Sequence, residues 1–199
     1  RKPSSERRRR RPENATIQDI PEVEMTPRDV RIKVHAASLN PVDWKIREGH
    51  LKRAISLKFP WILGQDMSGI VTDVGMRARN LKVGDRIYAR VDHKKMGTLA
   101  EYVSVEKTDV CKMPESLSFE EAASLPLVGL TAWQVLVEIM KLEKGQSIFI
   151  HSGAGGVGSF AIQLAKHIGA QVTTTASQAN HAFLKELGVD EIIDYATED

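Results

Sequence analysis

The feature that most constrains the fold of this chain is the glycine-rich hexapeptide Gly153-Ala154-Gly155-Gly156-Val157-Gly158, which has the pattern G-x-G-x-x-G. It follows the apolar run 147–151, which predicts a buried strand, and it opens the helical pattern 156–168. Between a strand and a helix, such glycines permit a tight turn and let the backbone approach a pyrophosphate closely, where the N–H groups of the helix start meet its charge. We therefore predict a dinucleotide site formed by five residues of the loop: Gly153, Gly155, Gly156, Val157 and Gly158.

Strand and helix patterns alternate on both sides of this loop. We predict helices over 131–141 and 177–187, and strands over 171–175 and 191–193. Strands joined by helices through short connections indicate a parallel sheet with right-handed crossovers. Only about three of the six strands of a complete sheet of this type can be placed. We therefore expect a C-terminally truncated piece of a longer protein, with an exposed sheet edge that favours association.

The sequence before this region has the pattern of a small β-rich domain. Short runs with strand character are separated by turn glycines and cover residues 30–34, 69–74, 85–89 and 99–105. Short strands at this spacing favour a barrel-like domain. Ser118 and Glu121 have the spacing of a capping box, which predicts a helix start after residue 118. We therefore expect an α/β chain in three parts, with a tail over 1–19, a β domain over 20–125 and an incomplete parallel-sheet domain over 126–199.

The start of the chain is strongly basic. Residues 1–11 hold seven basic residues and one acidic residue, so they contribute +6 to a formal net charge of +2 and the rest of the chain carries −4. Such a segment can bind nucleic acid or an anionic membrane surface. No aromatic residue is interleaved as a base-stacking platform requires. We therefore favour a disordered extension and expect no nucleic-acid partner.

Cysteine usage and hydropathy bear on the compartment. The single cysteine, Cys111, excludes an internal disulfide and fits a reducing environment. No apolar run approaches the roughly eighteen residues that a membrane span needs. We therefore expect a cytoplasmic protein that does not act in a membrane.

The identity of the dinucleotide is predicted from the end of the strand over 171–175. NAD-selective folds place an acidic residue there, which binds the hydroxyls of the adenosine ribose. No Asp or Glu lies between Gly158 and Glu186, and the strand ends in Thr174-Thr175-Ala176-Ser177. A phosphate on that ribose would meet hydroxyl groups, with Ser177 as the best donor. The sequence therefore favours NADPH, although no Arg or Lys follows Ser177 before Lys185.

Further motifs recur in a fixed order along the chain. In the β domain they are Leu39-Asn40-Pro41-Val42-Asp43, Leu63-Gly64-Gln65-Asp66-Met67-Ser68-Gly69 and Val83-Gly84-Asp85-Arg86-Ile87. Downstream they are Leu127-Val128-Gly129-Leu130-Thr131-Ala132-Trp133, the hexapeptide from Gly153 to Gly158, and Ile193-Asp194-Tyr195. In order and spacing these motifs resemble the medium-chain dehydrogenase/reductase superfamily, and in particular its zinc-free, zeta-crystallin-like quinone oxidoreductases. The resemblance covers about residues 20–199.

The resemblance implies a GroES-like β-barrel domain followed by a partial Rossmann domain, with the active-site cleft between them. It places Asn40 in that cleft as the catalytic candidate, near the nicotinamide or the substrate. Val128 and Thr131 would lie on the nicotinamide side, and Ser177 and Tyr195 would flank the phosphate on the adenosine ribose. Asn180 stands where members of the family often have the lysine for that phosphate. The parent protein would be a homo-oligomer.

The resemblance also implies chemistry without a metal. Zinc-dependent members have a cysteine before the first cleft helix and Gly-His-Glu in place of Gly64-Gln65-Asp66. With one cysteine in the chain, we expect no metal site. Hydride transfer from NADPH to a quinone or an α,β-unsaturated carbonyl then becomes the expected reaction, because the cofactor carries the hydride and the protein supplies orientation. Asn40 would donate to the acceptor oxygen or orient the nicotinamide, and solvent would supply the proton.

Three other interpretations remain open. The glycine-rich turn can be a turn without a ligand. The chain can also be a non-catalytic dinucleotide-binding or nucleic-acid-interacting protein that uses the same fold as a scaffold. Finally, the loop can belong to a nucleoside-binding methyltransferase of a different Rossmann class, although the preceding β domain argues against this.

Overall fold

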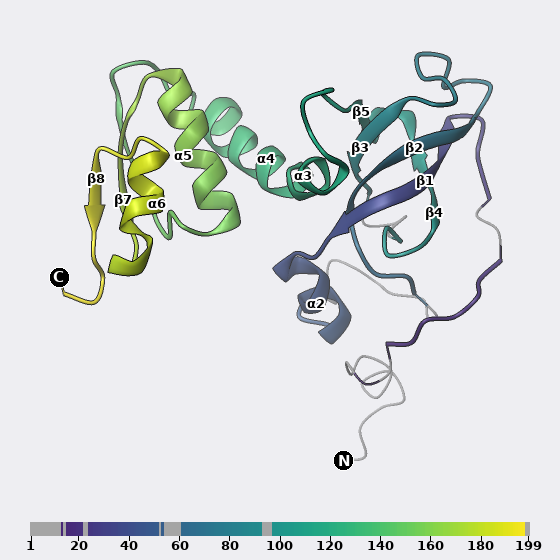
Figure 1. The fold of residues 1–199 in the computed structure, drawn as a ribbon, viewed down its shortest axis with the longest axis horizontal. Helices are drawn as coiled ribbons and strands as arrows, with labels where there is room; N and C mark the ends of the chain where they lie inside the picture. Colours follow the sequence, from purple (N-terminus) through teal and green to yellow (C-terminus); the bar gives the residue numbers. More distant parts are fainter. Residues whose placement is uncertain are drawn as a thin grey trace. The chain divides into compact units, whose positions relative to one another are not determined.

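The structure of the protein is a computed structural model that describes residues 13, 15–21, 24–51, 53, 61–92 and 97–197. These residues form two compact units, one up to Pro126 and one from Leu127 onward (Figure 1). Residues 15–20 are exposed and belong to no helix or strand. The Arg-rich run 1–11, with the prediction made for it, lies outside the described residues. Within the described part, no helix combines the length and the apolar character needed to cross a membrane.

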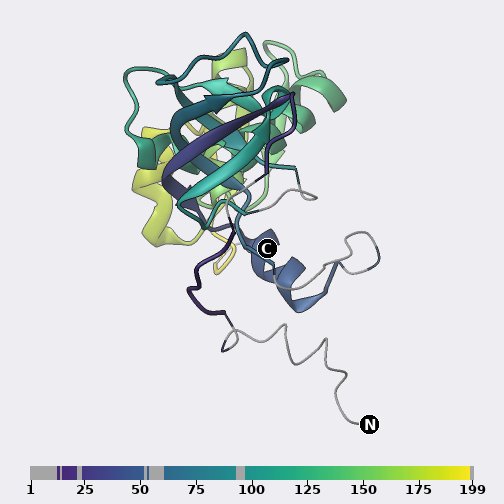
Figure 2. The ribbon, with the colours of Figure 1, turned by 90° about the vertical axis from the view of Figure 1, so that its right-hand side faces the viewer.

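The first unit is built on an antiparallel sheet. Its strands are β1 (Asp29–Ser38), β2 (Asp66–Val74), β3 (Arg86–Arg90), β4 (Tyr102–Glu106) and β5 (Val110–Lys112). They pair in the order β4-β1-β2-β3-β5, and Figure 2 shows them curving around the unit. Register shifts interrupt the β1–β2 pairing at Arg31/Ile32 and Val34/Ala36. Such bulges increase the local twist and let a short sheet enclose a core.

The core of this unit comes from alternate residues of the strands. Ile32, Met67, Val71 and Ile87 are completely buried. Gly69 allows β1 and β2 to lie together, because a Cβ there would overlap the carbonyl oxygen of Lys33. The predicted barrel-like β domain is therefore present as a strongly curved sheet.

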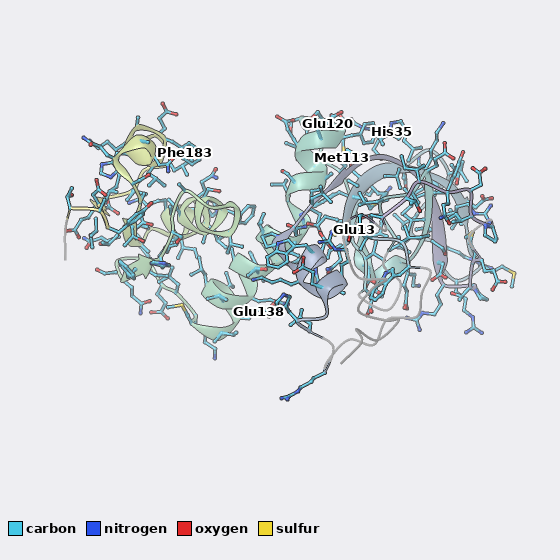
Figure 3. The ribbon with its side chains drawn as sticks, turned by 90° about the horizontal axis from the view of Figure 1, so that it is seen from below. Glu13, His35, Met113, Glu120, Glu138 and Phe183 are labelled. Atoms are coloured by element: carbon cyan, nitrogen blue, oxygen red, sulfur yellow. The ribbon has the colours of Figure 1, made fainter. Side chains whose placement is uncertain are left out.

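Helix α3 (Phe119–Ser124) follows the sheet and starts where the capping box predicts. The N–H of Glu121 donates to Ser118 Oγ at 3.1 Å, and the N–H of Ser118 donates to Glu121 Oε2 at 2.8 Å, which confirms the prediction. Phe119 stacks on His35 of β1 with ring centroids 4.4 Å apart (Figure 3 labels His35 and the neighbouring Glu120). The helix is thereby fixed against β1.

The second unit contains a parallel sheet of β6 (Ser147–Ile150), β7 (Gln171–Thr175) and β8 (Glu191–Ile193) in that order. Helix α5 (Gly156–Ile168) connects β6 to β7, and α6 (His181–Glu186) connects β7 to β8. This arrangement confirms the predicted strand–helix alternation. Its core lies between the sheet and the helices and includes Ile162, Val172 and Leu184, all completely buried.

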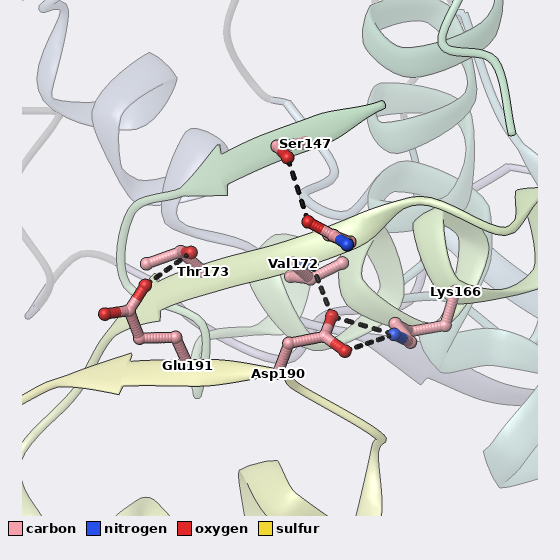
Figure 4. A network of polar contacts seen from close by, with 7 residues as sticks. Ser147, Lys166, Val172, Thr173, Asp190 and Glu191 are labelled. Atoms are coloured by element: carbon pink, nitrogen blue, oxygen red, sulfur yellow. Dashed lines mark hydrogen bonds and ion pairs between the residues drawn. The ribbon is translucent and has the colours of Figure 1, made fainter. Parts of the chain in front are cut away.

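Polar contacts join α5, β7 and β8 (Figure 4). Asp190 accepts from Lys166 Nζ at 2.8 and 2.9 Å and from the N–H of Val172 at 2.6 Å, so it links α5, β7 and the start of β8. Thr173 donates to Glu191 at 3.0 Å across the β7–β8 pair. These contacts fix the register of the βαβ unit.

Two helix predictions were wrong in their bounds. In place of a helix over 131–141, the chain forms α4 (Pro126–Trp133) and then a π-helix, η3 (Gln134–Ile139). The start is earlier because proline is preorganised for a first helical turn. The last turns form a wider π-helix, because the N–H of Met140 donates to the carbonyl of Val135, five residues earlier. The helix over 177–187 is likewise a 3₁₀ turn, η4 (Gln178–Asn180), followed by the shorter α6.

The predicted burial of the strand over 147–151 was also wrong. In β6 only Ile148 is buried, and Phe149 on the opposite face is 56% exposed. The described helices pack on one face of β6, so its side chains alternate between buried and exposed. An apolar run alone does not reveal which faces of a strand are covered.

Candidate functional site

The turn between β6 and α5 is strained and tied to the end of β7. Ser152 has φ 57°, a left-handed conformation that costs a non-glycine residue about 1–2 kcal/mol. Its N–H donates to Thr175 Oγ1 at 3.0 Å, and the N–H of Gly153 donates to the carbonyl of Thr175 at 3.1 Å. Thr175 therefore holds the glycine loop in a fixed place above the strand ends.

The loop glycines are of two kinds. A Cβ on Gly153 would overlap Thr174 Oγ1 and Ile162 Cδ1, and a Cβ on Gly158 would overlap the carbonyl oxygen of Ser152. These two glycines are buried and permit close packing of the turn against the strand and the helix. Gly155, Gly156 and Val157 are exposed instead and form the outer surface of the loop.

Helix α5 presents its start as a site for an anion. It is 13 residues long, and its N-cap, Gly155, offers no side chain to accept from the first-turn N–H groups. Its first turn contains no acidic residue. The helix dipole and the free N–H groups therefore favour negative charge beside Gly155, Gly156 and Val157. The glycine surface leaves room for such a charge to approach, so the residues present fit a pyrophosphate.

Val128 and Thr131 lie on α4, which packs beside this loop. A Cβ on Gly156 would come within 3.3 Å of Val128 Cγ1, and one on Gly129 would come within 3.3 Å of Phe160 on α5. The hydroxyl of Thr131 donates to the carbonyl of Leu127 at 2.7 Å, so its oxygen remains able to accept another hydrogen bond. Val128 is thus brought to the glycine loop, and Thr131 follows it along the same helix.

Ser177 and Tyr195 follow neighbouring parallel strands and therefore lie at the same edge of the sheet. The strand ends are joined by a hydrogen bond from the N–H of Ala176 to the carbonyl of Ile193 at 3.1 Å. Ser177 Oγ accepts from Asn180 Nδ2 at 3.3 Å, which leaves its own hydrogen available to another acceptor. Tyr195 is 64% exposed. This edge offers hydroxyl groups next to the end of β7.

Asn40 belongs to the first unit, where it is the N-cap of α2 (Pro41–Glu48). Its side-chain Nδ2 donates to Asp66 Oδ2 at 2.9 Å, and its backbone N–H donates to Asp43 Oδ2 at 2.8 Å. Asp43 also accepts from Gln65 Nε2 at 3.3 Å, and Gln65 Oε1 accepts from Arg90 at 3.0 Å. Asn40 is therefore held through both its backbone and its side chain.

Burial raises the pKa of Asp43. Hydrogen bonds from the Asn40 N–H and the Gln65 amide act in the opposite direction, as does the charge of Arg90. The amide of Gln65 has its nitrogen and its oxygen both engaged in this chain of contacts. Gln65, which the resemblance sets at the position of a histidine in zinc-dependent members, therefore connects a cation to a buried carboxylate.

Sequence reasoning did not identify two residues that organise these sites. They are Thr175, which holds the loop, and Arg90, which anchors Gln65. A hydroxyl at a strand end and a cation inside a strand are weak signals, because their partners are distant in sequence. Only the fold brings these partners into contact.

Comparison with known proteins identifies both units. Residues 26–115 match the alcohol dehydrogenase GroES-like domain, and residues 156–199 match the zinc-binding dehydrogenase domain. Over 185 residues the chain is 40% identical to the mitochondrial NAD(P)H oxidoreductase RTN4IP1 of Danio rerio, covering 85% of this chain and 48% of that protein. It is 42% identical over 187 residues to the chloroplastic NADPH-dependent alkenal/one oxidoreductase of Arabidopsis thaliana, covering 90% of this chain and 47% of that protein.

A solved structure agrees with the sequence matches. The quinone oxidoreductase from Coxiella burnetii superposes with a TM-score of 0.83 at 42% identity, over 94% of this chain and 60% of that one. The chain spans about half the length of the curated relatives that it matches.

A curved GroES-like β unit followed by a Rossmann-type βαβ unit defines a two-domain chain with a dinucleotide-binding fold. The order of these two units, their matches to known domains and the relatives of the chain also identify its family. The chain belongs to the medium-chain dehydrogenase/reductase superfamily.

Proposed function

We propose that this protein transfers hydride from NADPH to a quinone or an α,β-unsaturated carbonyl without a metal. The observation that carries the proposal is the strand–turn–helix at Gly153 to Gly158, in which buried glycines shape the turn and exposed ones border the free helix start. The relatives named above act as oxidoreductases on nicotinamide cofactors, quinones or alkenals according to their names. When bound, the nicotinamide supplies the hydride.

The residues of the second unit would bind and orient the cofactor. The N–H groups of Gly156, Val157 and Gly158 would meet the pyrophosphate, with Gly153 and Gly155 shaping the turn. Ser177 would donate its free hydroxyl hydrogen to the phosphate on the adenosine ribose, with Tyr195 beside it. Val128 and Thr131 would lie on the nicotinamide side. Asn40 is the proposed catalytic residue, which would donate to the acceptor oxygen or orient the nicotinamide.

Two features support NADPH and metal-free chemistry. The end of β7 carries hydroxyl groups where NAD-selective folds carry an acid. Gln65 stands where a zinc ligand would be, and its amide is committed to Asp43 and Arg90. We also propose that the domains span residues 20–125 and 126–199 after a tail over 1–19, that the protein is cytoplasmic, and that the parent protein is a homo-oligomer. Relatives named as mitochondrial and chloroplastic make the compartment one to be measured.

The activity is tested by following the oxidation of NADPH by the purified chain with a benzoquinone, a naphthoquinone and an alkenone. We expect turnover with NADPH that exceeds turnover with NADH and that survives treatment with a zinc chelator. Chelator-sensitive turnover would contradict the metal-free mechanism. Saturable NADPH binding without oxidation by any acceptor would favour the non-catalytic, dinucleotide-binding alternative.

A further inference from the structure

His151, Ser152 and Thr175 form a chain of hydrogen bonds where β6 and β7 end. The N–H of Ser152 donates to Thr175 Oγ1 at 3.0 Å, and the same oxygen lies 3.1 Å from His151 Nδ1. His151 and Thr175 directly follow Ile150 and Thr174, which pair across the two parallel strands. One hydroxyl group therefore contacts both residues that lead from β6 into the glycine loop.

The hydrogen of this hydroxyl determines the direction of each contact. Thr175 Oγ1 accepts from the N–H of Ser152, so its own hydrogen is left to donate. Thr175 is 8% exposed, and among the described residues the ring nitrogen of His151 is the one acceptor that this hydroxyl contacts. A buried hydroxyl hydrogen without an acceptor is costly. We therefore expect Nδ1 of His151 to accept and the hydrogen of the neutral ring to lie on Nε2.

The strained turn after β6 depends on this direction. Ser152 has φ 57°, a conformation that a non-glycine residue keeps only when its surroundings hold it. The backbone of Thr175 provides one hold, because its carbonyl accepts from the N–H of Gly153 at 3.1 Å. The hydroxyl provides the other, and only while a lone pair faces the N–H of Ser152. A partner that draws the hydroxyl hydrogen toward His151 keeps the lone pair in that place.

We propose that His151 is a positioning residue that fixes the Thr175 hydroxyl as an acceptor and thereby holds the glycine loop in the conformation that binds the cofactor pyrophosphate. This inference rests on the proposed function. His151 acts through Thr175 and Ser152. Because NADPH and NADH share the pyrophosphate, its effect should be the same for both cofactors, whereas Ser177 is expected to distinguish them.

Two substitutions at position 151 test the need for an acceptor. His151→Leu removes the acceptor at similar size, and we expect it to weaken the binding of NADPH and of NADH by the same factor, at least about threefold. His151→Asn places an amide oxygen close to the position of Nδ1 and should recover most of the lost affinity. Titrations that follow the fluorescence of the reduced nicotinamide measure both. Equal affinities of the two variants, or a loss confined to NADPH, would contradict the inference.

Thr173 provides a matched control for Thr175. It lies in the same strand, and its hydroxyl donates to Glu191 at 3.0 Å across the β7–β8 pair. Thr175→Val should weaken the binding of both cofactors at least about tenfold, whereas Thr173→Val should leave it within about twofold.

Combining the substitutions tests whether His151 acts through the hydroxyl of Thr175. In a Thr175→Val background, His151→Leu should cause no further loss of affinity, because the hydroxyl is already absent. Additive losses would show that His151 acts by another route and would contradict the inference. If Thr175→Val does not fold, the comparison of His151→Leu with His151→Asn decides alone.

The tautomer of His151 can be measured without a cofactor, which separates this inference from the proposed function. Ring ¹⁵N NMR of the purified chain, assigned with His151→Asn, should show the hydrogen of the neutral ring on Nε2. A hydrogen on Nδ1 would contradict the inference alone, and so would wild-type affinity in His151→Leu. A wild-type chain that binds neither cofactor would contradict the proposed function, and this inference with it.

Discussion

Gly153 and Gly156 occupy the same hexapeptide but lack a side chain for different reasons. Gly153 is buried against Thr174 and Ile162, where no Cβ fits. Gly156 is exposed at the first position of α5, and a Cβ there would meet only the movable side chain of Val128. The first glycine therefore serves the fold, and the second leaves the helix start open to a ligand.

The two glycines can be separated by substitution with alanine. Gly153→Ala should lower the free energy of unfolding by about 1–3 kcal/mol, because the methyl group overpacks the turn. Gly156→Ala should change stability by less than about 1 kcal/mol, yet weaken NADPH binding at least about tenfold, because its methyl group lies beside the N–H groups of the first turn. Chemical denaturation and a cofactor titration of both variants measure these effects. Equal loss of stability in both variants would contradict the distinction.

At the residue scale, the glycine loop could be located from the sequence, whereas the contacts that support the candidate site residues could not. The glycine hexapeptide is a local pattern with a direct physical meaning, so each of its members was assigned from spacing alone. The hydrogen bond between Asn40 and Asp66 joins residues 26 positions apart. No local pattern indicates such a contact, because it depends on how α2 enters the sheet.

Among the elements, the link from α5 to β8 depends on one surface acid. Hydrogen bonds from Lys166 and from the N–H of Val172 lower the pKa of Asp190 against the raising effect of burial. A carboxyl whose pKa is lower in the folded state stabilises the fold above its unfolded pKa, and this contribution is lost as the pH falls through the folded value. The βαβ unit should therefore lose this support in acid and keep it at neutral pH.

Asp190→Asn tests this electrostatic contribution. The side chain of Asp190 is 45% exposed, so solvent screens the pair, and we expect a loss of only about 0.5–1 kcal/mol in the free energy of unfolding at pH 7. The difference from wild type should shrink as the pH is lowered below about 4, where the free carboxyl also becomes protonated. Urea denaturation at several pH values measures it, with Lys166→Gln as the companion variant. A difference that stays constant with pH would show that the ion pair contributes nothing.

The bounds of helices and strands were most predictable where a glycine marks the end of a regular pattern of apolar residues. Helix α5 and strand β8 have the predicted bounds, because Gly169 ends the helix in a left-handed conformation and a short β-branched run follows Gly188. The helix after Pro126 was placed too late, since its apolar residues continue without a polar face. The π-helix Gln134–Ile139 depends on a backbone hydrogen bond across five residues, which side-chain patterns do not indicate.

At the scale of the whole molecule, each of the two units has its own core and its own candidate site residues. Each has its own buried cluster, centred on residues such as Ile32 and Met67 in the first and Ile162 and Val172 in the second. The first carries Asn40 and its carboxylate supports, and the second carries the glycine loop and the hydroxyl edge. Family membership was predictable at this scale, because several short motifs recur in order over nearly the whole chain.

We propose that the loop of the second unit binds NADPH, with Ser177 favouring the phosphorylated ribose. The most direct test is a titration of the purified chain with NADPH and with NADH, following the fluorescence of the reduced nicotinamide, for wild type and Ser177→Asp. We predict saturable binding with NADPH at least about tenfold tighter than NADH, and loss of that preference in Ser177→Asp because a carboxylate repels the phosphate. A folded wild-type chain that binds neither cofactor, or binds both equally, would contradict the account.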